Sequence, residues 1–318
     1  MSLIAGWLHA RAAARHSRDT SRDFEELLGG TRLRLVDVGA AGELEPRWRR
    51  VSGAVDYVGF EPDERSRARL LANDQGCASY RILDTALSDQ AGDLDLHLCR
   101  KPMASSSFEP DADFLGRFPD VGRFDVVGTV VLPARRLDDL DLAGCDFIKV
   151  DVQGAELAVL RGASGMLDAC LGVEAEVEFL PMYRGQPLFG EVSGYLSTVG
   201  LEFVDFVSLN RWRRDRFDGH GQLVSADALF LRAPEQEWWG SADAATVTRY
   251  AGICALYHRY DLVRRLVDMH PSITLGPGQQ DALNRMERRF DRSRRPVSTA
   301  QSWLQVAGSG EAVVHLTY

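Results

Sequence analysis

The stretch RLRLVDVGAAGE, residues 32–43, joins a short apolar run to a turn that contains two glycines. Such a run followed by a turn is typical of a buried strand in a parallel sheet. Because Gly39 and Gly42 lack a Cβ atom, the backbone there can turn sharply and approach a ligand closely. Asp37 ends the run, and amides at the start of a following helix would hold a carboxylate. The pattern predicts a nucleotide-type site at the carboxyl edge of a sheet, although a plain strand-to-helix turn would look the same.

A second motif, GFEPDE at residues 59–64, places Glu61 at the end of the next apolar run. It follows the glycine turn by about 20 residues, where an acidic side chain accepts from ribose hydroxyls. The alternative is that Glu61 and Asp63 only cap the next helix. A dinucleotide fingerprint needs a glycine where this chain has Ala41, which disfavours NAD. S-adenosylmethionine carries a carboxylate, an ammonium group and a ribose, and it suits both motifs.

Apolar runs and helical patterns alternate on both sides of these motifs. We expect strands at 32–38, 55–60, 79–87, 93–98, 126–132, 146–152, 172–179, 201–207 and 226–232, and helices at 63–73, 155–167 and 189–199. This alternation predicts a doubly wound, mostly parallel Rossmann-like α/β sheet with helices on both faces. A polar loop joins the last two strands, which predicts an antiparallel hairpin at the sheet edge.

Two segments flank this pattern. Residues 1–31 are predicted to be helical, residues 32–234 to form the main domain, and residues 235–318 to form a helical extension. In the extension, Ile253, Leu256, Tyr257 and Tyr260 recur at helical spacing. They predict a face that packs on the main domain or on another subunit of a homo-oligomer.

Composition excludes several classes of function. The chain has 318 residues and a formal net charge of -9, so it is not expected to bind nucleic acid through general charge attraction. Its five cysteines form no CxxC pair or His/Cys cluster, which predicts reduced thiols in a cytoplasmic protein without a zinc site. His9 and Arg11 interrupt the N-terminal apolar stretch, which is too short for a signal peptide or a membrane-spanning helix.

A third motif, DFIKVDVQGAELAVLRGA at residues 146–163, resembles the signature of FkbM-like class I S-adenosylmethionine-dependent methyltransferases. The matching residues are Lys149, Asp151, Gly154, Glu156, Leu160, Gly162 and Ala163. The two motifs above, ALSDQAGDLDL (86–96), EVEFLPMYRGQPLFGEV (176–192) and GQLVSADALFLR (221–232) are similar to the family in the same order. The resemblance covers residues 32–232. It implies S-adenosylmethionine as cofactor and methylation of a small-molecule hydroxyl in natural-product or surface-polysaccharide pathways. The acidic, polar residues favour a sugar.

The candidate site residues follow from the three motifs. We expect the donor to contact Asp37, Gly39, Ala40, Gly42, Glu61, Pro62, Thr85 and Ala86. Asp151 ends a buried strand and is the first candidate to accept the proton of the attacking hydroxyl, although it would also serve to cap the next helix or pair with Lys149. The resemblance implies Glu176 as a second catalytic residue. No metal is predicted, although a divalent cation is compatible with these carboxylates.

The acceptor is expected to contact Ser106, Ser107, Gln153 and Tyr183. The family usually carries Glu where this chain has Gln153, whose neutral amide can still position a hydroxyl. The serines lie in a long loop over 100–125, where relatives often show a serine pair, and this loop is either a lid or a plain surface loop. Tyr183 either touches the acceptor or covers the core.

Three carboxylates, Glu174, Glu176 and Glu178, alternate along one predicted strand and therefore share a face. Unpartnered carboxylates on a buried face would be costly, so the face is solvated or it contacts arginine, lysine, a cation or substrate. Two other functions stay open: an NAD-dependent oxidoreductase, and a catalytically inactive methyltransferase fold that only binds ligands, which Gln153 would allow.

Overall fold

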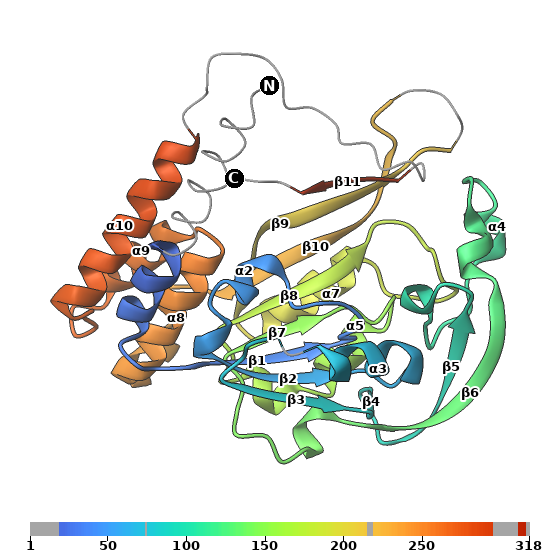
Figure 1. Cartoon of the computed structure of the whole chain (residues 1–318), viewed down its shortest axis with the longest axis horizontal. Helices are drawn as coiled ribbons and strands as arrows, with labels where there is room; N and C mark the ends of the chain where they lie inside the picture. The colour runs from blue at the N-terminus through green and yellow to red at the C-terminus, as the bar shows by residue number, and fades with distance from the viewer. Residues whose placement is uncertain (1–18, 74, 215–218, 295–310, 316–318) are drawn as a thin grey trace.

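A computed structural model of the chain describes residues 19–73, 75–214, 219–294 and 311–315. Its central sheet has the strand order β11-β9-β10-β8-β7-β1-β2-β3 (Figure 1). The strands from β8 to β3 are parallel, whereas β10, β9 and β11 pair antiparallel. Their bounds are β1 Leu33–Val38, β2 Val55–Phe60, β3 Ser79–Leu83, β7 Phe147–Val150, β8 Gly172–Glu178, β9 Leu201–Trp212, β10 Gln222–Arg232 and β11 Glu311–His315. The predicted parallel sheet with an antiparallel hairpin at its edge is confirmed.

A second, three-stranded sheet consists of β4 (Ala86–Leu87), β6 (Val126–Arg135) and β5 (Gly92–Cys99). The single strand predicted over 79–87 is therefore divided, because β3 joins the central sheet and β4 pairs with β6. The strands predicted near 93–98 and 126–132 pair with each other and not with the central sheet. This small sheet lies beyond the carboxyl ends of β1, β2 and β3 in Figure 1, so it covers the edge where the donor is expected.

The helices are α2 (Pro46–Arg49), α3 (Glu64–Ala72), α4 (Ala112–Leu115), α5 (Glu156–Arg161), α6 (Ser164–Leu167), α7 (Phe189–Thr198), α8 (Ala244–Leu256), α9 (Tyr260–Met269) and α10 (Pro277–Arg294), with a further helix over 19–28. The single helix predicted over 155–167 is broken at Gly162. A Cβ atom there would lie 2.1 Å from the Ser88 carbonyl oxygen, so the close backbone approach at this break requires glycine. None of the described helices is long and apolar enough to cross a membrane.

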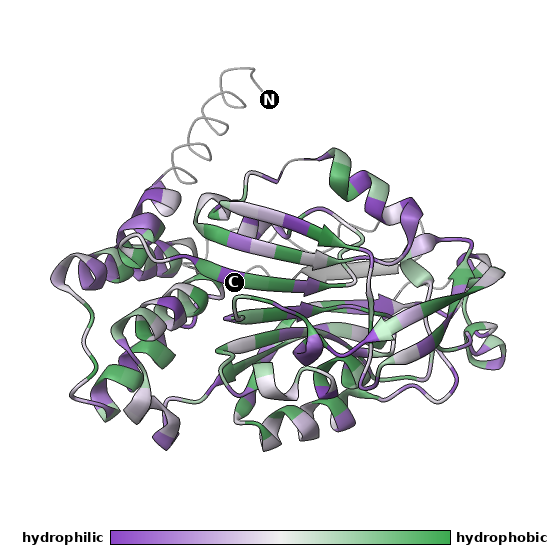
Figure 2. Cartoon of the chain, turned by 90° about the horizontal axis from the view of Figure 1, so that it is seen from below, coloured by the Kyte–Doolittle hydropathy of each residue, from purple (hydrophilic) through white to green (hydrophobic). Residues whose placement is uncertain are grey.

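Each face of the sheet buries one set of alternating side chains. On one face, Val36 and Val38 of β1 pack in a core with residues of α5 and α7. On the other face, Leu33 and Leu35 pack with the helix over 19–28 and with α2, α8, α9 and α10. Figure 2 shows the corresponding pattern, with hydrophobic residues along the central strands and mixed polarity on the helices. The sheet thus has helices on both faces, as predicted.

The C-terminal helices share the core of the main sheet. Ile253, Tyr257 and Tyr260 are buried there, and Leu256 packs against it. The face predicted at this helical spacing therefore packs within the chain. Strand β11, which the helical expectation for 235–318 did not include, pairs with β9 at the sheet edge. The division of the chain at residues 31 and 234 stays a prediction, and residues 1–18 lie outside the described part.

Candidate functional site

A pocket lies at the carboxyl ends of β1, β2 and β7, between the central sheet and the small sheet. The pocket is lined by these predicted site residues: Gly39, Glu61, Pro62, Thr85, Ala86, Ser107, Asp151 and Gln153. It is not lined by the other predicted site residues, which are Asp37, Ala40, Gly42, Ser106, Glu176 and Tyr183. Sequence reasoning missed the apolar wall, which is formed by Phe60, Leu87, Leu94, Leu96 and Met103. The alternation DLDLHL over 93–98 was the available signal for Leu94 and Leu96, because it places both on one face of β5.

Three backbone amides of the turn after β1 donate hydrogen bonds to backbone carbonyl oxygens. The amides of Gly39 and Ala40 donate to the Phe60 carbonyl at 2.9 and 3.1 Å, and the Ala41 amide donates to the Gly39 carbonyl at 2.7 Å. The next helix, α2, begins only at Pro46. No helix therefore starts directly after this turn, and the binding of a donor carboxylate by backbone amides here stays a prediction.

The two glycines of this turn have different roles. Gly39 has φ +81°, and a Cβ atom there would lie 1.8 Å from the Asp151 carbonyl oxygen, whereas a Cβ at Gly42 would meet nothing within 4 Å. Gly39→Ala is therefore expected to lower the free energy of unfolding by about 3 kcal/mol, from left-handed strain and a forced backbone shift. Gly42→Ala, the matched control, should be neutral in the same thermal unfolding experiment. Equal melting temperatures for the two variants would contradict this packing.

Asp37 lies beneath the pocket and not in its wall. Tyr57 donates its hydroxyl to Asp37 Oδ2 at 2.8 Å, and Lys149 Nζ lies 3.9 Å from Asp37 Oδ1 and 4.0 Å from Asp151 Oδ2. Burial raises the pKa of Asp37. Burial also opposes the charge of Lys149, but the Asp37 and Asp151 carboxylates outweigh it and raise the pKa of the lysine. Lys149 therefore stays charged between the two acids, and its distance of 4.0 Å from Asp151 fits the alternative in which Asp151 pairs with this lysine.

Glu61 is placed at the end of β2 with 5% of its surface exposed. Its Oε1 accepts from the Asp63 amide at 2.8 Å, while Asp63 itself caps α3 by accepting from the Arg65 amide at 2.9 Å. Capping of the helix thus belongs to Asp63, and the Glu61 carboxylate lines the pocket. Burial raises the pKa of Glu61 to about 7.

Gln153 connects the pocket wall to the buried acids. Its Nε2 donates to Asp151 Oδ1 at 2.9 Å and to Glu176 Oε2 at 2.5 Å. Its Oε1 lies 3.1 Å from the Tyr183 hydroxyl, and its carbonyl oxygen accepts from Ser106 Oγ at 2.7 Å. A glutamate here would have no proton for the two carboxylates. Gln153, Tyr183 and Ser106 therefore form a hydrogen-bonded support that holds Asp151 and Glu176 together, and the fully buried Tyr183 covers the core.

The face of β8 that carries Glu174, Glu176 and Glu178 is mostly buried, so the alternative in which this face is solvated is wrong. Glu174 and Glu178 expose 2% and 1% of their surface. Glu174 accepts from the Tyr257 hydroxyl at 2.7 Å and lies 3.8 Å from Arg47 Nη1. Burial, together with neighbouring carboxylates, raises the pKa of Glu176 and of Glu178 well above the usual value. The face thus reduces its charge by retaining protons and by ion pairing.

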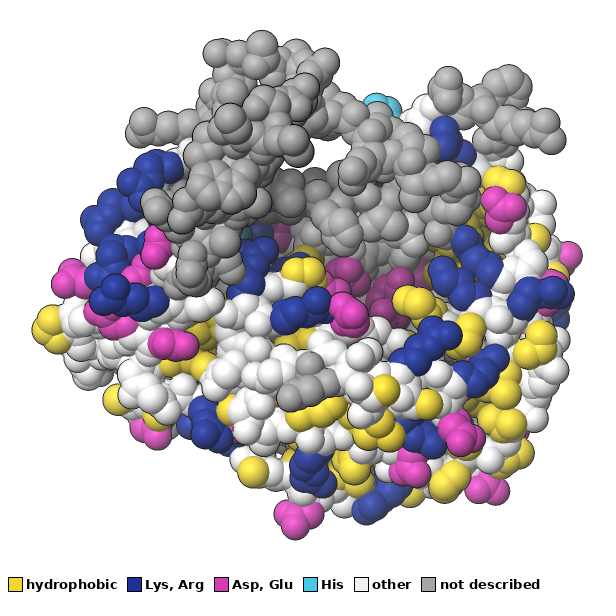
Figure 3. All heavy atoms as spheres, in the orientation of Figure 1, with side chains coloured by type: hydrophobic (Ala, Val, Ile, Leu, Met, Phe, Trp, Pro, Cys, Tyr) yellow, Lys and Arg dark blue, Asp and Glu magenta, His cyan; other side chains and the backbone are white. Residues whose placement is uncertain are grey.

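Asp227 of β10 stands opposite Glu176 and extends this acidic group. Its Oδ2 accepts from Ser208 Oγ at 2.5 Å, and burial raises its pKa to about 6. Figure 3 shows acidic side chains near the middle of the face of the molecule in view, with lysine and arginine side chains beside them. Asp227 lies within the family-like segment GQLVSADALFLR, but it was not predicted as a site residue, since only the pairing of β10 with β8 brings it opposite Glu176.

Three of the acids could also hold a cation. Asp151, Glu156 and Glu176 each offer an oxygen atom, and these atoms lie within 4.8 Å of one another. Glu156 already accepts from the Val152 amide at 2.8 Å and the Gly154 amide at 3.0 Å. Gln153 Nε2, a donor, points to the other two acids. A proton shared among these three carboxylates would stabilise the arrangement as well as a divalent cation would.

Comparison with known proteins gives a family. The family described as “Methyltransferase FkbM domain” matches residues 37–203. The 2-O-methyltransferase NoeI of Sinorhizobium fredii (strain NBRC 101917 / NGR234) is 32% identical over 163 residues, which are 48% of this chain and 66% of that protein. The match therefore spans slightly less than two thirds of this relative.

Two solved structures are similar in fold. Methyltransferase FkbM from Methylobacillus flagellatus KT is 16% identical with a TM-score of 0.38, over 63% of this chain and 43% of that chain. Magnesium protoporphyrin IX methyltransferase from Synechocystis PCC 6803, with bound S-adenosylmethionine, is 10% identical with a TM-score of 0.32, over 69% of this chain and 80% of that chain. These likenesses concern the fold alone.

Proposed function

The chain belongs to the FkbM family of S-adenosylmethionine-dependent methyltransferases, and we propose that it methylates a hydroxyl group of a small molecule, with a sugar as the expected acceptor. One observation carries the proposal. The pocket at the carboxyl edge places Glu61, suited to a ribose, and Asp151, suited to accept a proton, in a single lining. The 2-O-methyltransferase named above supports transfer to oxygen.

The residues of this pocket fit the donor. The left-handed backbone at Gly39 brings the turn after β1 close to the Asp151 carbonyl, which leaves no room for a side chain between them. Phe60, Leu87 and Leu94 offer an apolar wall for an adenine ring, and the Glu61 carboxylate can accept from ribose hydroxyls. When bound, S-adenosylmethionine supplies an activated methyl group on a sulfonium.

The protein's own part is to orient the acceptor and to take up a proton. Methyl transfer requires alignment of the acceptor oxygen, and an alcohol must lose its proton as it attacks. Asp151 lines the pocket with its side chain 32% exposed, so it can reach such a hydroxyl. Gln153 fixes the Asp151 carboxylate and joins it to Glu176, whose pKa is raised by burial and by neighbouring carboxylates. We assign Asp151 as the base and Glu176 as the second candidate catalytic residue.

Calorimetry separates this function from its alternatives. S-adenosylmethionine and its demethylated product, S-adenosylhomocysteine, are expected to bind, and NAD is not. Transfer of a labelled methyl group to one of a panel of glycans would establish catalysis. Binding of NAD alone would indicate an oxidoreductase, and donor binding without transfer to any hydroxyl compound would indicate a binding module.

Donor binding is expected to depend on pH through Glu61. With a pKa of about 7 in the free protein, this carboxyl is mostly protonated at pH 6 and mostly ionised at pH 8. Ribose hydroxyls donate to the ionised form, so affinity for S-adenosylhomocysteine should fall on acidification, by up to about tenfold per pH unit below 7. Calorimetry at pH 6, 7 and 8 measures this. Glu61→Gln keeps the shape and should flatten the profile; an unchanged slope would assign the titration to another group.

A further inference from the structure

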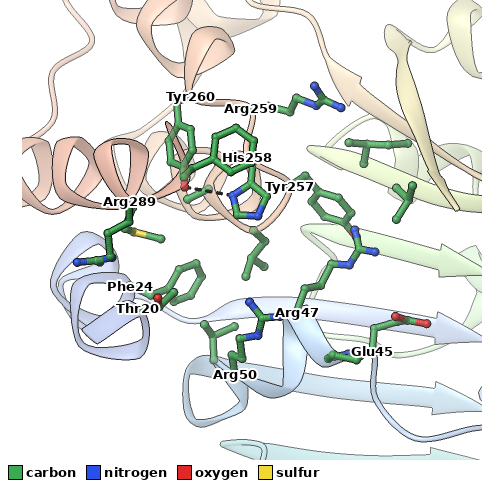
Figure 4. A pocket seen from close by; sticks show the side chains of 18 of the residues that line it. Thr20, Phe24, Glu45, Arg47, Arg50, Tyr257, His258, Arg259, Tyr260 and Arg289 are labelled. Atoms are coloured by element: carbon green, nitrogen blue, oxygen red, sulfur yellow. Dashed lines mark hydrogen bonds between the residues drawn. The ribbon is translucent and has the colours of Figure 1, made fainter. Parts of the chain in front are cut away.

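A second cavity, of about 410 Å³, lies on the face of the sheet that α2 and the C-terminal helices cover (Figure 4). None of its lining residues lines the donor pocket. We propose that this cavity binds a phosphate group, and that the phosphate belongs to the acceptor, as in a nucleoside diphosphate sugar. The second part rests on the proposed function, whereas the first does not.

The charge of the cavity favours an anion. Among the described residues that line it, the acidic one is Glu45 and the basic ones are Arg47, Arg50, Arg259 and Arg289. The whole chain carries a formal net charge of -9, so this excess of arginine is a local feature. Guanidinium groups present planar, forked donors that match phosphate oxygens.

The arginines of this cavity differ in their ion-pair partners. Arg259 and Arg289 are held by the carboxylates of Asp205 and Asp23. Within the described residues, Arg50 has no ion pair, and Figure 4 shows its side chain directed toward His258 across the cavity. Arg47 lies over the Tyr257 ring, 4.7 Å from its centroid, and 3.8 Å from Glu174. A phosphate at Arg50 would gain a charge-assisted donor, and Arg47 would be a second donor that the phosphate shares with Glu174.

His258 lies in the cavity among positively charged side chains. Its ring stacks on Phe290 with the centroids 4.3 Å apart, and its Nδ1 lies 3.3 Å from the Tyr260 hydroxyl. Burial and the charges of Arg50, Arg47 and Arg259 lower the pKa of His258 to about 4. Burial is the largest cause, and the positive charges of the arginines add to it, so the imidazole stays neutral.

Two residues of the cavity contact β8, the strand that carries Glu176. Arg47 and Tyr257, which line the cavity, both contact Glu174 of β8. Glu176 follows two residues later on the same face, about 7 Å further along the strand, and Gln153 joins it to Asp151. A sugar with its hydroxyl at Asp151 could therefore place a phosphate near Arg47. Glu174 does not oppose this, because Arg47 and Tyr257 already compensate its charge.

Calorimetry on the full chain tests the phosphate site, with inorganic pyrophosphate and uridine diphosphate as probes. Both are expected to bind, with and without saturating S-adenosylhomocysteine, because the two pockets share no residue. Arg50→Gln should weaken binding about tenfold or more. Arg49→Gln is the matched control, since the neighbouring Arg49 pairs with Glu43 and does not line the cavity, and its affinity should equal that of the wild type.

Stronger binding of uridine diphosphate than of pyrophosphate would assign a nucleoside diphosphate, and equal binding a phosphate alone. Absence of binding by both probes, or binding that Arg50→Gln leaves unchanged, would overturn the site. Failure of S-adenosylhomocysteine to bind while pyrophosphate binds would count against the proposed methyl transfer and not against this cavity.

The acceptor role has its own test. Labelled methyl transfer to uridine diphosphate sugars is expected to exceed transfer to the corresponding free sugars, with Arg50→Gln raising KM for the former and leaving kcat unchanged. Equal transfer to both kinds of sugar, or to neither, would overturn the role of the cavity in holding the acceptor.

Discussion

Asp151→Asn is expected to lower the rate of methyl transfer by about 10²–10⁴-fold, the usual cost of a lost general base. The substitution keeps the shape of the side chain and removes its charge. Asp151 lines the pocket, accepts from Gln153 Nε2 and lies 4.0 Å from Lys149. Because its role is to accept a proton, kcat should fall while the affinity for S-adenosylhomocysteine stays nearly unchanged. Single-turnover rates and calorimetry on the same preparation measure the two quantities.

The variant Glu176→Gln shows whether Glu176 contributes less than Asp151 to the rate of methyl transfer. Glu176 does not line the pocket, and it reaches Asp151 through Gln153. A loss smaller than that of Asp151→Asn is therefore expected. If Asp151→Asn retains the wild-type rate across neutral pH, Asp151 is not the base, and Glu176 becomes the residue to test. Loss of wild-type activity with a chelator would instead favour a cation held by Asp151, Glu156 and Glu176.

Glu61→Ala is expected to weaken donor binding by about 2–4 kcal/mol, which is tens- to hundreds-fold in Kd. The variant removes a charged acceptor from the end of β2, where two ribose hydroxyls are expected, and it leaves the Asp63 amide without its partner. Titration with S-adenosylhomocysteine measures the loss.

Glu64→Ala is the matched control for Glu61→Ala. Glu64 is the first residue of α3 and is exposed, and it does not line the pocket. Its removal should leave donor affinity at the wild-type level. Wild-type affinity in Glu61→Ala would remove this residue from the donor site, and an equal loss in both variants would indicate a general effect on α3.

Much of the donor pocket was predictable because it depends on order along the chain. In a parallel sheet, the residues that end successive strands meet at one edge. Gly39, Glu61 and Asp151 each follow an apolar run, so their shared pocket could be inferred from the three motifs. The same logic does not tell which side of a strand end faces the ligand, and for this reason Asp37 was expected in the pocket wall but lies beneath it.

The sequence by itself determined the parallel sheet, its antiparallel edge hairpin and the residues at the carboxyl ends of the strands, because apolar runs, glycine turns and acidic strand ends are local patterns. Only the tertiary structure decided which acids are buried and what they contact. Asp227 meets Glu176 through strand pairing, Tyr183 and Ser106 meet Gln153 through loop packing, and Arg47 and Tyr257 meet Glu174 although α2 and α8 lie far apart in the chain. Contacts between distant segments depend on how whole faces pack, and this packing is the physical reason that no local pattern could predict them.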